Sequence, residues 1–199
     1  MKSVLASIRP QQCENIANKK QTIVVRKSRP KLETPSKCYI YCTIGGDALC
    51  PPHANSSKWD IHRQNNGTAN GREMTATERE KSDYCFANGK VIGEFVCDSY
   101  IGWGVNPLDG LYMIFPNELA AACLTGKDFE KYGNGKTLYG WHISALQIYD
   151  KPMELSEFRR CDKCPYGPIE RCNEHEFSCD GAYNLTRPFQ SWGYVEDVK

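Results

Sequence analysis

Four cysteines in the last quarter of the chain have the residue type and spacing of a metal site: Cys161, Cys164, Cys172 and Cys179. A Cys-x-x-Cys pair directs two sulfurs to one point, and four thiolates form a tetrahedral site for structural Zn²⁺ in a reducing cell. The residues between them, such as Pro165 to Pro168, offer little apolar surface to bury, so this segment needs a cross-link to hold its structure. Zn²⁺ is therefore predicted, with His175 as an alternative ligand and with two disulfides or four free thiols as the alternatives.

A run of cations could bind a polyanion near the start of the chain: Arg26, Lys27, Arg29 and Lys31. The preceding stretch reads as a strand, a helix opened by Pro10 and a second strand that ends in this run. Positive charge gathered beside strand edges is typical of a nucleic-acid site. Ser7, Arg9 and Lys20 are further candidate contacts to the same anion.

Glu94 is a candidate general base, with Thr22 and His142 as assisting groups in a hydrolase. It shares strand parity with Ile92, which would place its carboxylate on an apolar face where desolvation raises a pKa. The alternative is that Phe95 and its neighbours of the same parity face the core and Glu94 faces solvent. The sequence leaves both orientations open.

Trp141 is a candidate platform for a nucleobase, with His142 hydrogen-bonded to the edge of that base. The competing interpretation is that a tryptophan on a strand belongs to the core. Cys38 and Cys42 have the same strand parity and are expected to face the core as small apolar residues.

Short segments rich in β-branched and aromatic residues predict the strands: Val4–Ile8, Gln21–Val25, Cys38–Thr43, Val91–Cys97, Gly140–Tyr149 and Ser191–Val195. Helices are predicted from Pro, Asn and Thr capping signals: Pro10–Asn18, Thr77–Phe86, Asn117–Leu124 and Pro152–Phe158. Tight hairpins and regular strand–helix alternation are both rare here. The expected fold is therefore α+β, a small mixed or antiparallel barrel decorated with short helices.

Composition sets the remaining expectations. The 199 residues carry 25 Lys and Arg against 24 Asp and Glu, so any nucleic-acid site must come from local clustering. No apolar run approaches the roughly 20 residues of a membrane helix, and no secretion signal is visible, which predicts a soluble, cytoplasmic protein. One domain over residues 1–199 is expected, with a polar insertion at about 44–74 and the Cys-rich insert at about 159–184.

Several segments resemble the ASCH domain, a member of the PUA-like superfamily of barrels related to RNA-binding modules. They are the SIRP turn (Ser7–Pro10), Thr22-Ile23, Arg26–Pro30, Cys38–Thr43, GKVIGEFVCD (Gly89–Asp98), GWHIS (Gly140–Ser144) and LTRPFQSWGYVE (Leu185–Glu196). At the positions of the ASCH motif Gly-x-Lys-x-x-Glu-x-Arg stand Lys19, Gln21, Val24 and Arg26, of which the arginine is retained. The chain looks like phage and gut-bacterial ASCH proteins that carry a C-terminal cysteine-rich insert.

The resemblance implies an RNA-binding barrel, and some small relatives are amidohydrolases that use a Lys, a Thr and a Glu. Gln21 and Val24 stand at the Lys and Thr positions, and Glu94 is the candidate for the Glu. Three functions are thus considered: an RNA or nucleic-acid binding module, a hydrolase of a modified base or nucleotide, and an adaptor that binds protein through the zinc knuckle. The binding module is favoured.

Overall fold

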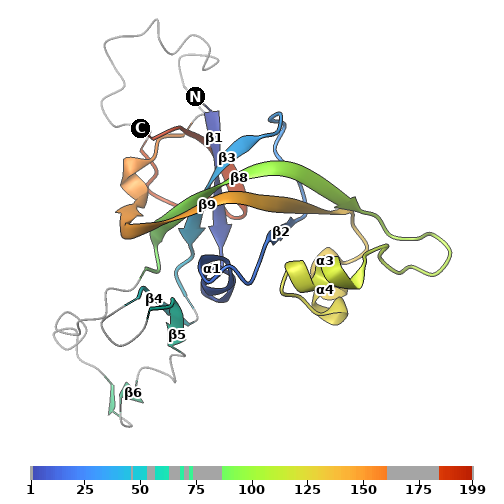
Figure 1. The fold of residues 1–199 in the computed structure, drawn as a ribbon, viewed down its shortest axis with the longest axis horizontal. Helices are drawn as coiled ribbons and strands as arrows, with labels where there is room; N and C mark the ends of the chain where they lie inside the picture. Colours follow the sequence, from blue (N-terminus) through green and yellow to red (C-terminus); the bar gives the residue numbers. More distant parts are fainter. Residues whose placement is uncertain are drawn as a thin grey trace, which may run out of the picture.

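The computed structural model describes residues 2–45, 47–52, 57–62, 68–69, 72–73, 87–160 and 184–198. Its centre is one six-stranded sheet with the order β10-β1-β3-β8-β9-β2 (Figure 1). The strands are β1 (Lys2–Ile8), β2 (Ile23–Arg26), β3 (Ser36–Cys42), β8 (Lys90–Trp103), β9 (Leu138–Glu154) and β10 (Trp192–Glu196). Each contains or overlaps one of the predicted strands.

The sheet is mixed and open at both edges. β1 and β3 run parallel, whereas the other neighbouring pairs are antiparallel. β2 and β10 are the edge strands, so the predicted barrel is not closed by a continuous backbone ladder. The predicted α+β class with a mixed sheet is confirmed.

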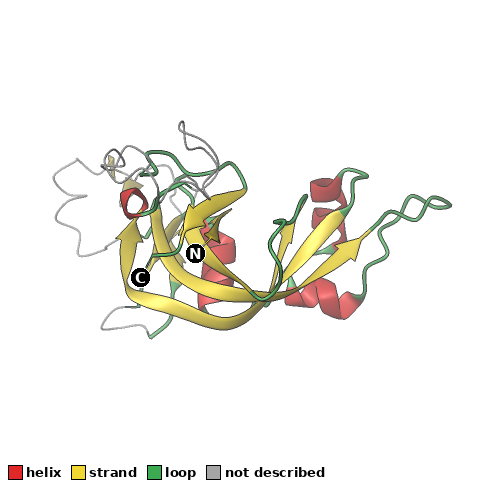
Figure 2. Cartoon of the chain, turned by 90° about the horizontal axis from the view of Figure 1, so that it is seen from above, coloured by secondary structure: helices red, strands yellow, loops and turns green. Residues whose placement is uncertain are grey.

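β8 and β9 extend beyond their predicted ends and form the long curved arms of the sheet (Figure 2). Their pairing shifts register at three places, including the steps between Val91 and Gly93 and between Glu94 and Val96. Each bulge changes which face the next residue occupies. Ile92 therefore packs in the main core, while Glu94 pairs with Tyr39 on the other side of the sheet.

Most of the buried apolar side chains lie in three clusters. The largest lies between the sheet and α1 (Pro10–Ala17), and it includes Trp141 and the predicted core cysteines Cys38 and Cys42. The second lies across the sheet around Tyr39 and Phe158. The third joins β2 and the ends of the long arms to the helices through Trp103.

Two short helices follow the end of β8: α3 (Pro116–Ala121) and α4 (Gly126–Gly133). The predicted start at Asn117 is wrong by one residue, because Pro116 is the first helical position and the Glu118 carboxylate accepts a hydrogen bond from the Phe115 backbone N–H. Gly126 does not end a helix but opens α4, with the Thr125 hydroxyl accepting from the Asp128 backbone N–H. None of the helices in the described ranges is long and apolar enough to cross a bilayer.

The predicted helix at Pro152–Phe158 is wrong. β9 continues to Glu154 because Met153 and Glu154 pair with Val91 and Lys90 of β8. Only a short 3₁₀ turn, Leu155–Glu157, follows. The predicted helix at Thr77–Phe86 lies outside the described residues.

The polar insertion contributes short ribbons: β4 (Ala48–Cys50) with β5 (Asp60–His62), and β6 (Thr68–Ala69) with β7 (Arg72–Glu73). Trp59 is buried against the main core, and its backbone N–H and C=O bond to the Asn18 amide at the end of α1. This part of the insertion is therefore fixed to α1.

A buried glycine on β8 marks the closest approach of the two arms. A Cβ at Gly93 would overlap the Gln147 carbonyl oxygen and lie 3.0 Å from Ile148 Cα, both backbone atoms. We expect Gly93→Ala to lower the free energy of unfolding by about 1–3 kcal/mol, because such overpacking has no soft side chain to displace. Urea unfolding measures this change.

Gly102→Ala is the matched control, because Gly102 lies on the same strand and a Cβ added there would meet no heavy atom within 4 Å. It should be neutral or stabilising by up to about 1 kcal/mol through the unfolded state. Equal losses in the two variants would contradict a close approach specific to Gly93.

Candidate nucleic-acid interface

Side chains, not a backbone ladder, join the two open edges of the sheet. The Arg26 guanidinium on β2 donates to the Ser7 carbonyl oxygen on β1 at 2.8 Å. Trp192 Nε1 on β10 donates to Ser28 Oγ at 3.1 Å, and the Lys31 backbone N–H donates to the Tyr194 hydroxyl at 2.8 Å. We call this set of contacts the seam. The cationic run, from Arg26 to Lys31, begins at the end of β2 and follows the seam.

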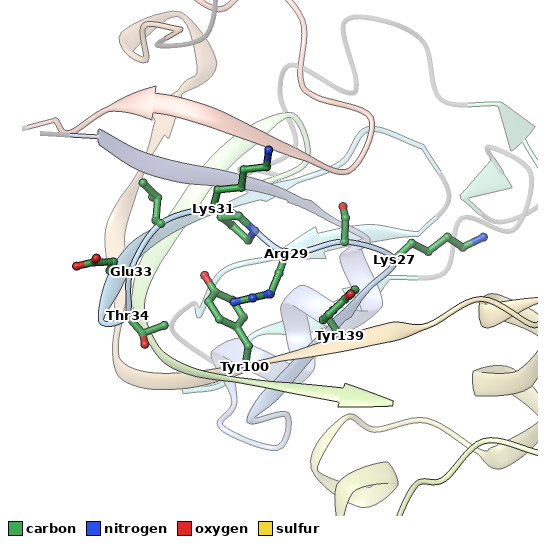
Figure 3. A pocket seen from close by; sticks show the side chains of 10 residues that line it. Lys27, Arg29, Lys31, Glu33, Thr34, Tyr100 and Tyr139 are labelled. Carbon is green, nitrogen blue, oxygen red and sulfur yellow. The ribbon is translucent and has the colours of Figure 1, made fainter. Parts of the chain in front are cut away.

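A hollow of about 900 Å³ lies on one side of this run, lined by residues 27–34 together with Tyr100 and Tyr139. We call it the Tyr100 pocket (Figure 3). The Arg29 guanidinium lies over the Tyr100 ring, 5.6 Å from its centroid. Lys27 and Lys31 add positive charge, against the single carboxylate of Glu33. The pocket therefore offers cations beside two half-buried aromatic rings.

A second hollow, of about 920 Å³, lies on the other side and shares Lys27 and Ser28 with the first. We call it the Arg26 pocket. Its charged lining consists of Arg9, Arg26, Lys27, Lys131 and Asp128. Tyr132 of α4 also lines it, with Lys27 Nζ lying 5.1 Å from the centre of its ring.

Arg26 is the unusual member of this lining, because it is a guanidinium only 6% exposed. It donates to the carbonyl oxygens of Val25 and Ser7, whereas its Nε has no hydrogen-bond partner. Burial lowers the pKa of this guanidinium from its ordinary value, although an arginine stays charged. Among the described residues no carboxylate forms an ion pair with it, and the carboxylates of Glu14 and Glu94 bond to other groups.

The other sequence candidates for nucleic-acid contact lie away from the two hollows. Trp141 is fully buried, with its ring edge-on to Tyr100 and Trp192, so no face of its indole is open to a base. Lys20 is exposed but forms an ion pair with Glu14 of α1 at 2.9 Å.

The candidate catalytic residues are not brought together. Glu94 accepts from the Tyr149 hydroxyl and pairs with Lys37 Nζ at 3.1 Å, in a cluster that also holds Asp197. His142 Nδ1 lies 2.7 Å from Asp98, which lowers the pKa of that carboxyl. Glu94 faces Gln147, five residues along β9 from His142, or about 16 Å at the rise of a strand. Thr22 lies near His142, because its carbonyl oxygen accepts from the backbone N–H of the next residue, Ile143; of the three candidates, Glu94 is therefore the distant one.

Comparison with solved structures identifies the architecture. The crystal structure of the ASCH protein from Zymomonas mobilis matches 98% of this chain and 87% of its own, with a TM-score of 0.52 and 14% sequence identity. This chain has the ASCH fold. A Tyr→Phe and a Ser→Ala variant of the Zymomonas protein match at the same TM-score, with 14% and 13% identity over 91% and 88% of those chains. No protein-family model and no curated protein matches the sequence.

Two positions of the ASCH motif are core positions in this ASCH fold. The Gln21 side chain is buried and donates to the Ile23 carbonyl oxygen, and Val24 of β2 is fully buried in the main core. Arg26, the retained arginine, is the motif residue that lines a pocket. Neither Gln21 nor Val24 presents a group for acid–base chemistry.

Several residues of the interface were missed by the sequence reasoning. Tyr100 and Tyr139 lie on the extended arms beyond the predicted strand ends, and Lys131 and Tyr132 belong to α4, which was not predicted. A signal for α4 exists in Thr125 followed by Asp128, a pattern typical of a helix start. These residues complete the lining of the two pockets on the ASCH fold.

The cysteines of the predicted zinc site lie outside the described residues of the ASCH fold, and those described contain no group of three metal-binding side chains. Zinc at Cys161, Cys164, Cys172 and Cys179 thus stays a prediction. We expect about one Zn²⁺ per chain by elemental analysis of the purified protein, and a lower content in Cys164→Ser. Cys123→Ser is the control, since this exposed thiol is described in the structure and lies 38 residues before Cys161 in the sequence. Zinc-free protein with reactive thiols would contradict the prediction.

Proposed function

We propose that this protein binds single-stranded RNA across the seam. The observation that carries the proposal is the joining of the two pockets along Lys27 and Ser28, which brings five exposed cations and one buried guanidinium into one continuous lining. They are Arg9, Arg26, Lys27, Arg29, Lys31 and Lys131. Only two carboxylates, Glu33 and Asp128, share this surface among the residues that line the two pockets.

The aromatic residues favour an unpaired strand over a duplex. Tyr100 and Tyr139 line one pocket and Tyr132 the other, so aromatic rings lie beside the phosphate-binding cations. Proteins that read single strands combine these two elements, because bases without a partner stack on aromatic rings while phosphates meet cations. RNA is proposed ahead of DNA because of the resemblance to the PUA-like superfamily.

Fluorescence anisotropy with a labelled single-stranded RNA, and with DNA of the same sequence, tests the proposal. The affinity should fall steadily as salt rises from about 50 to 200 mM, since each phosphate contact releases counterions. RNA should bind more tightly than DNA. No binding at the lowest salt, or binding without salt dependence, would overturn the proposed function.

A further inference from the structure

The Arg26 pocket differs from the Tyr100 pocket in what lies at its wall. The Tyr100 pocket has exposed cations on a surface run, whereas the Arg26 pocket includes a charge that is almost entirely buried. A buried donor without an acceptor is destabilising, because it has lost its water without gaining a protein partner. Arg26 lines the pocket and its buried Nε has no hydrogen-bond partner, so this guanidinium is incompletely paired and an anion that enters the pocket beside it gains a charge-assisted interaction.

The first turn of α1 borders the same pocket. Arg9, the N-cap residue, and Gln12, the third helical residue, both line it. The first backbone N–H groups of a helix have no acceptor within the helix, and here no side chain caps them and no acidic residue stands in the first turn. A helix start of this kind favours an anion, and phosphate in particular.

The net positive charge of the lining is larger than the single negative charge of one phosphodiester. Four cations face one carboxylate, and Asp128 already accepts a hydrogen bond from Thr125 Oγ1 at 2.6 Å. A phosphate inside an RNA chain carries one negative charge, whereas a phosphomonoester carries nearly two at neutral pH. The terminal group also has only one nucleoside attached, so it can reach a buried guanidinium that a phosphate flanked on both sides would approach less closely.

We propose that the Arg26 pocket binds the terminal phosphomonoester of an RNA strand, with Arg26, Arg9, Lys131 and the first turn of α1 as its contacts. This inference rests on the proposed RNA binding and adds its preferred substrate class, a strand with a phosphorylated end. The remaining nucleotides then follow Lys27 across the seam toward the Tyr100 pocket, because Lys27 and Ser28 line both hollows.

Three RNAs of one sequence test the inference: one with hydroxyl groups at both ends, one with a 5′-phosphate and one with a 3′-phosphate. We expect one phosphorylated strand to bind at least about tenfold more tightly than the hydroxyl strand. Lys131→Gln and Arg9→Gln should remove most of this preference, since both side chains are exposed members of the lining and neither supports the core. Arg26 itself is a poor first variant because it also closes the seam.

Lys127→Gln is the matched control, because Lys127 lies on the same helix as Lys131, is exposed and does not line the pocket. It should keep the preference for the phosphorylated end. Equal binding of all three RNAs, or a preference that Lys131→Gln and Arg9→Gln leave intact, would overturn the inference while leaving RNA binding standing. Failure of all three RNAs to bind would overturn both.

Discussion

Reversing the charges of Lys27 and Arg29 together is expected to weaken RNA binding by about 100-fold near 0.1 M salt, with the fold unchanged. Lys27 lies where the two pockets meet, and Arg29 lies over the Tyr100 ring. Both side chains are exposed, so Lys27→Glu/Arg29→Glu leaves the core intact. For single strands each lost phosphate contact makes the negative slope of log K against log salt shallower by about 0.7, so the loss of two contacts should make it shallower by about 1.4.

Lys127→Glu/Lys151→Glu supplies the control, because it changes net charge equally at two exposed positions outside both pockets. Anisotropy titrations at several salt concentrations measure affinity and slope for both variants, and circular dichroism checks the fold. A similar loss in the two variants would mean that binding follows overall charge, and would remove the seam from the proposal.

Trp141→Ala is expected to lower the free energy of unfolding by about 3–5 kcal/mol, a large part of the stability of a typical domain. The ring is fully buried, and it packs edge-on against Tyr100 at 6.2 Å and Trp192 at 5.8 Å between centroids. Truncation leaves a cavity at the centre of the main core. Trp141→Phe should cost less, because it keeps most of the volume and removes a buried indole N–H that has no partner.

Tyr100→Leu separates a core role from a stacking role. Tyr100 is half-buried and lines the pocket, so its replacement should weaken RNA binding by about 1–3 kcal/mol while costing less stability than Trp141→Ala. Urea unfolding and anisotropy on the same preparations compare the variants. If Trp141→Ala kept its stability but lost affinity, the stacking role first considered for Trp141 would be restored.

The location of the six main strands was predictable because their apolar runs are long enough to dominate the local pattern. Their ends were not. β8 continues past Cys97 through Asp98 and Ser99, which are exposed and polar, so the pattern fades while the hydrogen bonding continues. At the other end, Pro152 suggested a helix start, but pairing with β8 holds that segment extended.

The candidate site was only partly predictable for a related reason. Arg26, Lys27 and Arg29 belong to a cationic run that the sequence shows directly, Ser7 and Arg9 end the first predicted strand, and all five line the two pockets. The faces of Glu94 and Trp141 depend on bulges and on the curvature of the sheet, which leave no mark in a single sequence. The faces of Glu94 and Trp141 became clear only from the strand pairing in the structure.

The seam also affects how readily the sheet opens locally. Strands joined by a ladder separate only when many backbone bonds break at once. Side-chain contacts instead link β2 to β1 through Arg26, and the residues after β2 to β10 through Trp192 and Tyr194. Parting there is the least costly opening of the sheet, so amide hydrogens of β2 should exchange with deuterated solvent sooner than those of β3, which lies between β1 and β8. RNA bound across both edges would stabilise the closed sheet, so it should slow that exchange and raise the melting temperature.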